Sequence, residues 1–186
     1  MFQTRHEGNP MKKAAISVVM LACLSGCVAL TPQRQVSLTN TFNPQEVAWF
    51  NSTGTGSITG QAFFQTRGGQ PRTWAGLEVA LQPHSTYGDE RLRAIYGSTD
   101  TGYAPALATR VQFNPDSSAY LQTLKKSTCD AQGNFSFTGL PAGNYVIVSV
   151  LAWTIPGQEF APPQGGALMK SVTLKDGENT RIILTH

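Results

Sequence analysis

Short runs in which apolar and polar residues alternate fill most of the chain after residue 56, and Gly, Pro, Asn or Asp closes most of them. Alternation with a period of two is typical of a strand that buries one face, and the closing residues favour turns. The runs are 57–64, 77–81, 135–137, 145–153, 168–174 and 180–185. The pattern therefore predicts an all-β fold in which about seven strands form a two-sheet sandwich.

Three details refine this sandwich. The run 145–153 is apolar nearly throughout, so we expect a central strand that is covered on both faces. Asp176-Gly177 separates the last two runs and is a hairpin signal. Gln164-Gly165-Gly166 follows several prolines, and we expect it to reverse the chain at the rim of the sandwich. A rim loop that binds a ligand is the alternative for this segment.

The composition supports an all-β domain. The 186 residues include 18 Gly and 11 Pro, and only 13% of them are charged. A helical bundle or a coiled coil needs charged outer faces and few helix breakers, so both are excluded. The hydrophobic share of 40% argues against disorder, and the length fits one domain.

Residues 84–127 interrupt the regular succession of strands. Within them, 87–97 is expected to form one or two helical turns. The runs 106–113 and 119–126 are expected to form an added hairpin around Asn114-Pro115-Asp116. Connections of this length in a compact domain usually carry function or are disordered. We therefore treat the segment as an insertion, and both a functional and a purely structural role stay open for it.

The first 26 residues have the layout of a secretory signal. Lys12 and Lys13 precede the apolar run 14–24, and small residues follow it. The run is too short to span a bilayer, which takes about 20 residues. We therefore expect residues 1–26 to be a signal peptide, with translation starting at Met11.

The end of this signal is more specific. Leu24-Ser25-Gly26-Cys27 resembles the lipobox of bacterial lipoproteins. The resemblance implies that Cys27 carries a diacylglyceryl thioether and, in Gram-negative bacteria, an N-acyl chain. Because Val28 stands where an Asp would favour retention in the inner membrane, it also implies an outer-membrane anchor facing the periplasm. The polar stretch 27–55 is expected to be a flexible tether, except that 47–50 could pack on the domain as a short strand.

Cysteine and charge limit the possible partners. Cys23 leaves with the signal and Cys27 carries lipid, so Cys129 is the one thiol left in the mature chain. This excludes an intramolecular disulfide and a multi-cysteine zinc site, and we expect Cys129 to be buried. The signal also removes three of the 14 basic residues and one of the 11 acidic ones. With charge almost balanced, we expect no nucleic-acid partner, and no cofactor is indicated.

One motif resembles a known family. Asp130-x-x-Gly133-x-Phe135-x-Phe137-x-x-Leu140-Pro141-Ala142-Gly143-x-Tyr145, together with 56–62 and 74–83, resembles carboxypeptidase regulatory-like domains. The resemblance covers residues 56–186 and implies a transthyretin-like β-sandwich. Asp and Gly at the start of the motif build a tight turn, and the two Phe residues, two positions apart, face the core. These roles are structural and give no catalytic machinery.

The candidate binding residues are aromatic or basic. Tyr offers a large amphipathic contact at a low cost in conformational entropy, which suits recognition of a polar polymer or a protein surface. The candidates are Trp74, Tyr87, Arg91, Arg93, Tyr96, Tyr103 and Trp153. We therefore expect a lipid-anchored, non-catalytic module that binds an envelope protein or a cell-surface glycan.

Two other functions stay open. Some structural lipoprotein subunits of envelope and secretion machines also have a transthyretin-like sandwich, so such a role is supported by fold analogy alone. A hydrolase using His84 is the second alternative. His84 and His186 are the two His residues of the mature chain, and it has no Gly-x-Ser-x-Gly element. The sequence therefore predicts neither an enzyme nor a metal site.

Overall fold

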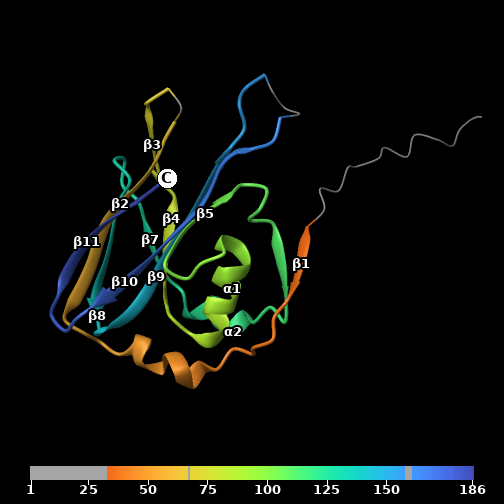
Figure 1. Ribbon diagram of the computed structural model, residues 1–186. Helices are drawn as coiled ribbons and strands as arrows, with labels where there is room; N and C mark the ends of the chain where they lie inside the picture. The colour runs from red at the N-terminus through yellow and green to blue at the C-terminus, as the bar shows by residue number, and fades with distance from the viewer. Residues whose placement is uncertain (1–32, 67, 158–160) are drawn as a thin grey trace, which may run out of the picture. The chain divides into compact units, whose positions relative to one another are not determined.

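The computed structural model of the protein describes residues 33–66, 68–157 and 161–186. The segment expected to be a signal peptide, 1–26, and Cys27 lie outside these residues. Nine strands form two facing sheets (Figure 1), which confirms the predicted two-sheet β-sandwich. The large sheet has the order β5-β10-β9-β4-β7, and in the small sheet β2 pairs with β11 on one side and with β3 and β8 on the other. The strands of the large sheet are β5 (Thr101–Pro105), β10 (Gln164–Leu174), β9 (Gly143–Trp153), β4 (Glu78–Pro83) and β7 (Lys125–Thr128). Those of the small sheet are β2 (Gly56–Gln65), β11 (Asn179–Thr185), β3 (Pro71–Thr73) and β8 (Asn134–Leu140).

The core lies between the inner faces of the two sheets. Alternation places every second residue of β2 there, including Ile58, Ala62 and Phe64, while Thr59 is exposed. Phe135 and Phe137 of β8 are buried and Ser136 is exposed, as the motif predicted. Cys129 is also buried in this core as a free thiol, and burial raises its pKa.

The turn before β8 has the expected construction. The backbone N–H groups of Gln132 and Asn134 donate to Oδ1 of Asp130 at 2.9 and 2.8 Å. The Asn134 side chain also donates to Oδ2 of Asp130. This hydrogen bond first, and then those from the backbone, hold the pKa of the Asp130 carboxyl below its usual value. Gly133 has φ 81°, a left-handed conformation that favours glycine.

The turn at Asp176-Gly177 differs from the prediction. It connects β10 to β11, but β11 pairs in parallel with β2 in the small sheet, so no hairpin forms. Leu174 and Ile182 both point into the core from their own sheets. The turn therefore carries the chain across the edge of the sandwich, and the hairpin prediction was wrong.

Strand β9 is central, between β10 and β4, but it is covered on both faces for only half its length. Tyr145, Val146 and Ile147 are fully buried, whereas Val150 is 52% exposed. Helix α1 (Thr86–Tyr96) covers the outer face at Val146 and ends before Val150 is reached. The prediction of a doubly covered strand therefore holds for its first half.

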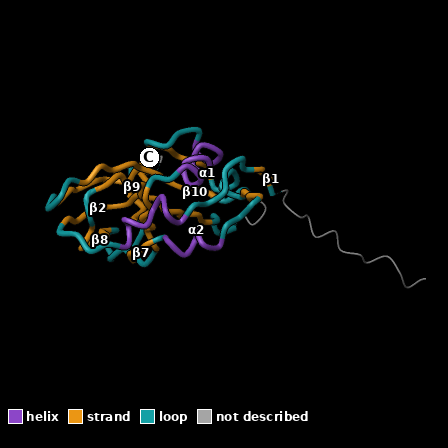
Figure 2. Tube along the Cα trace, turned by 90° about the horizontal axis from the view of Figure 1, so that it is seen from below, coloured by secondary structure: helices purple, strands orange, loops and turns teal. Residues whose placement is uncertain are grey.

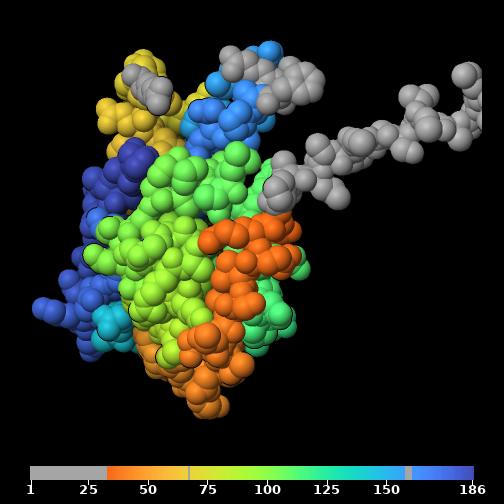
Figure 3. Space-filling view, turned by 45° about the vertical axis from the view of Figure 1, so that its right-hand side comes forward, coloured from red at the N-terminus to blue at the C-terminus, as the bar shows by residue number. Residues whose placement is uncertain are grey.

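The segment 33–55 is not a tether. Strand β1 (Arg34–Ser37) pairs in parallel with β6 (Val111–Asn114), and the 3-10 helix η1 (Pro44–Asn51) buries Phe50 in the core. Figure 3 shows this segment in orange, lying against the green insertion. Its apolar residues cover a second cluster of buried rings in the insertion, which removes apolar surface from water. The tether prediction for 27–55 was therefore wrong over its described part, although the packing expected for 47–50 is observed, as a helix.

The insertion contains more helix than expected. Helix α1 has 11 residues, begins after Ser85, whose Oγ accepts from Gly88 N at 3.1 Å, and ends at Gly97 with φ 73°. The hairpin expected for 106–126 does not form, because β6 pairs with β1 and residues 118–123 form helix α2 (Ser118–Thr123). Both helices, purple in Figure 2, lie with β1 on one side of the sandwich.

In the described part of the chain, no helix is long and apolar enough to cross a membrane.

Candidate functional site

Aromatic side chains gather at the end of the sandwich from which two hairpins project, β2–β3 and β9–β10 (Figure 1). Phe64 lies at the centre of this group. Its ring centroid is 4.8 Å from that of Trp74, 5.8 Å from that of Tyr103 and 6.1 Å from that of Trp153. Arg72 lies over Trp153 and His186 stacks on Tyr103, and we name Arg72, Tyr103, Trp153 and His186 the aromatic rim.

Two adjacent glycines make room for the rim rings. A Cβ on Gly165 would lie 2.6 Å from the Trp153 ring, and one on Gly166 would lie 2.7 Å from the Tyr103 ring. Both glycines lie inside β10, where Gln164 already pairs with Trp153 and Gly165 with Ala152, so neither glycine reverses the chain. The reversal expected at Gln164-Gly165-Gly166 was therefore misplaced.

The rim rings are held in place but are not fully covered. Tyr103 Oη donates to the Gly165 carbonyl at 3.0 Å, and the His186 ring stacks on Tyr103 with centroids 3.8 Å apart. The Arg72 guanidinium lies 4.8 Å from the centre of the Trp153 ring, which links the two hairpins. Tyr103 and Trp153 are each half-buried, so part of their surface meets solvent.

Three of the residues predicted to bind are therefore brought together here. Tyr103 and Trp153 lie at the surface, whereas Trp74 is 0% exposed and supports the rim from below. Trp74 is a core residue and cannot touch a ligand at the surface. The sequence did not indicate Phe64 or Arg72 as residues of a site. Its pattern did place Phe64 on a predicted strand and Arg72 shortly after a Gly-Gly turn.

Tyr87 and Arg91 belong to the interior of the insertion. Tyr87 is 0% exposed, donates to the Pro115 carbonyl at 2.9 Å and accepts from Ser117 N at 3.0 Å. The Arg91 guanidinium donates to Tyr87 Oη at 3.1 Å and lies 4.0 Å from the centre of the Phe113 ring. These contacts hold the insertion together, so the binding role expected for both residues does not fit their positions.

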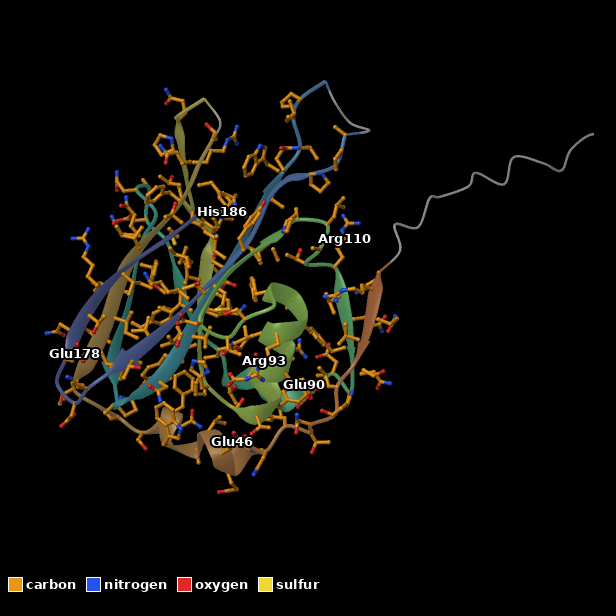
Figure 4. The ribbon with its side chains drawn as sticks, in the orientation of Figure 1. Glu46, Glu90, Arg93, Arg110, Glu178 and His186 are labelled. Carbon is orange, nitrogen blue, oxygen red and sulfur yellow. The ribbon has the colours of Figure 1, made fainter. Side chains whose placement is uncertain are left out.

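The last two candidates, Arg93 and Tyr96, lie on α1. Tyr96 packs in the cluster under α1, and burial raises its pKa. Arg93 is exposed and lines an open cavity of 530 Å³. We name the residues that line this cavity the polar cradle. Besides Arg93, they are Thr39, Asn40, Glu46, His84, Ser85, Thr86, Asp89 and Glu90. Figure 4 shows Glu46, Glu90 and Arg93 near one another, far from His186.

The carboxylates of the cradle bind to the protein itself. Glu90 accepts from the backbone N–H groups of Thr39 and Asn40 at 2.7 and 3.0 Å, and from both of their side chains. These bonds, that from Thr39 N first, lower the pKa of Glu90 to about 2. Glu46 accepts from Thr86 N at 2.7 Å and from Thr86 Oγ1 at 2.9 Å, at the start of α1.

His84 also has partners that the sequence did not reveal. Its Nδ1 is 2.7 Å from Oδ1 of Asp89, and its Nε2 is 2.9 Å from Oγ of Ser171. Ser171 lies 87 residues further along the chain, so no local motif joins the two. Residues 33–66, 68–157 and 161–186 contain no group of three or more His, Cys, Asp or Glu that could hold a metal ion.

The chain is similar to a protein of known structure. The neighbour is named a "putative carbohydrate binding protein" and comes from Pseudomonas aeruginosa. The TM-score is 0.63 and the sequence identity is 25%, and the alignment covers 79% of this chain and 99% of the neighbour's. No protein-family model and no curated protein matches the chain.

Proposed function

We propose that the protein is a lipid-anchored envelope protein whose aromatic rim binds glycan. The proposal is supported chiefly by two half-buried rings, Tyr103 and Trp153, that meet at one end of the sandwich. The name of the Pseudomonas neighbour, whose chain aligns over 99% of its length, points to the same class of ligand. We also propose that residues 56–186 form a carboxypeptidase regulatory-like domain, as the resemblance of the motif implies.

The chemistry of the rim suits a sugar. The face of an aromatic ring carries the negative part of its quadrupole, and the C–H face of a sugar ring carries partial positive charge. Arg72 adds N–H donors beside Trp153 that can reach ring hydroxyls. The role proposed for the rim is binding, without bond cleavage.

A binding measurement on the full-length protein in detergent tests the rim. On an array of envelope polysaccharides, we expect saturable binding that Trp153→Ala weakens at least about 10-fold, as loss of an aromatic anchor does. Tyr103→Phe keeps the ring and is expected to retain most of the affinity.

Trp49→Ala is the matched control. Trp49 is also half-buried, but it belongs to η1 and packs on Gly143 and Tyr145. Figure 1 shows η1, the orange helix, at the end of the sandwich opposite the two hairpins. This variant should bind glycan like the parent protein. Equal losses in the Trp49 and Trp153 variants, or no glycan binding by the parent protein, would contradict the proposed site.

The anchor is tested separately. Labelling cells with a palmitate analogue should mark the parent protein and not Cys27→Ser, and the labelled protein should fractionate with the outer membrane. Two or more acyl chains make attachment stable, whereas one gives marginal binding. An unlabelled parent protein with an intact leader would refute the anchor and leave glycan binding untouched.

A further inference from the structure

His84 lies between an acid and a hydroxyl group that come from different elements. Asp89 is in the first turn of α1, His84 directly follows β4, and Ser171 lies on β10. With Nδ1 2.7 Å from Asp89 Oδ1 and Nε2 2.9 Å from Ser171 Oγ, both ring nitrogens are within hydrogen-bond distance. Ser-His-Asp arrangements recur on unrelated folds and are recognised by this geometry, whatever the order of the residues.

The chemistry of the three groups fixes their hydrogen-bond roles. An ionised carboxylate only accepts, so Nδ1 of His84 carries the proton and donates to Asp89. In the neutral ring Nε2 is then an acceptor, and the Ser171 hydroxyl is the donor that faces it. Asp89 therefore holds the imidazole in the tautomer that can take a proton from Ser171.

We propose that Ser171 is a nucleophile toward small carboxylic esters of polar alcohols, with His84 as general base and Asp89 as a positioning residue. Ser171 and His84 are half-buried, so neither is sealed from solvent. His84 and Asp89 also line the polar cradle, where the exposed guanidinium of Arg93 can donate to the hydroxyl groups of such an alcohol. Among the described residues, none pairs with the guanidinium of Arg93, which leaves its donors available to such a substrate.

The reaction is a two-step acyl transfer to water. Ser171 Oγ bonds to the carbonyl carbon as its proton passes to Nε2 of His84. The bond from that carbon to the alcohol oxygen breaks, and the alcohol leaves with the proton. Water, deprotonated by His84, then attacks the acyl-Ser171 ester, releasing the acid and restoring the hydroxyl.

This site is separate from the aromatic rim. Tyr103 of the rim pairs with Leu168 on β10, three positions or about 10 Å from Ser171, and packs on the core side of the sheet. Ser171, two positions from Met169, lies on the opposite side, which α1 covers. The inference therefore does not depend on glycan binding, and the non-catalytic role proposed above concerns the rim alone.

The first experiment treats the intact protein with a fluorophosphonate probe and maps the modified residue by mass spectrometry. We expect the probe on Ser171, and no labelling after heat denaturation. Because this measurement uses the parent protein, it needs no variant to fold. Absence of the probe from Ser171 would overturn the proposal and make the three residues a hydrogen-bonded link between α1 and β10.

The second experiment follows hydrolysis of 4-nitrophenyl acetate. Ser171→Ala and His84→Ala should each lower kcat/KM at least about 100-fold, as loss of a nucleophile or base does. Asp89→Asn should lower kcat and leave KM unchanged, a split that a merely structural role would not produce. Thr173→Ala, two positions along β10, is the control. Equal activity in Ser171→Ala and Thr173→Ala would refute the nucleophile.

Discussion

The aromatic rim and the polar cradle satisfy their side chains in opposite ways. At the rim, Tyr103 and Trp153 pack on Phe64 and keep part of their surface exposed. In the cradle, Glu90 accepts four hydrogen bonds from two residues and Glu46 accepts two from one residue. Polar side chains alone therefore do not mark a binding site, because these two carboxylates already bind groups of the protein itself.

This difference divides the expected effects of substitution. Changes to the rim rings should lower ligand affinity and leave the fold intact. Changes to Glu46 or Glu90 of the cradle should lower the free energy of unfolding and leave glycan affinity intact. The glycines beside the rim rings should be exceptions to this division, because they stabilise the fold although they lie at the proposed binding end.

Gly165→Val should have the largest effect on stability. Gly165 has φ 82°, and an added Cβ would lie 2.2 Å from the carbonyl oxygen of Leu151. Neither the backbone nor the Trp153 ring can move away without loss of packing, so we expect a loss of about 3 kcal/mol or more. Urea unfolding of the full chain measures it.

Gly157→Val separates the clash from the backbone strain. Gly157 has φ 78°, but none of the residues that the structure describes lies within 4 Å of an added Cβ. Its loss should be smaller, about 1 kcal/mol, because strain at positive φ is then the only penalty. Similar losses in the two variants would mean that the rim rings do not pack on Gly165 as described.

How far the sequence predicts the fold depends on whether the contacts are local or distant along the chain. Strand positions follow from alternation along the chain, and the Asp130 turn depends on residues within four positions. Which strand pairs with which depends on distant contacts, so Asp176-Gly177 was read as a hairpin. The apolar residues of the segment 33–55 pack on rings more than 30 residues away. Because most of the segment is polar, its composition gave no sign that these few residues would pack on the domain.

The sites follow the same rule. Tyr103 and Trp153 could be named from residue type, but a sequence does not show that they meet at Phe64. Trp74 and Tyr87 were named on the same grounds and are core residues, because large rings are as useful inside a protein as at its surface. Ser171 could not be paired with His84, since β10 and the start of α1 meet only in the folded chain.

Glu90→Gln is expected to show a smaller and pH-dependent effect. The pKa of Glu90 is lowered from its ordinary 4.5 to about 2, so the ionised carboxylate stabilises the folded state. That stability is fully present above about pH 5 and is lost as pH falls through 4.5 toward 2. The parent protein should therefore melt above Glu90→Gln at pH 7, and the two melting temperatures should converge by pH 2. A gap in melting temperature that does not change with pH would contradict the role of the charge.

Glu46→Gln should have the smallest effect, because Glu46 binds one residue where Glu90 binds two. Its Oε1 accepts from Thr86 N and Oγ1, and thereby joins η1 to the first turn of α1. Weakening such a contact at a helix start costs about 1 kcal/mol, which urea unfolding can resolve. Glu78→Gln is the control, since Glu78 pairs with Lys126 in an exposed ion pair that contributes about 0.5 kcal/mol. If Glu46→Gln also weakened glycan binding, the cradle would take part in recognition and the division between the two regions would fail.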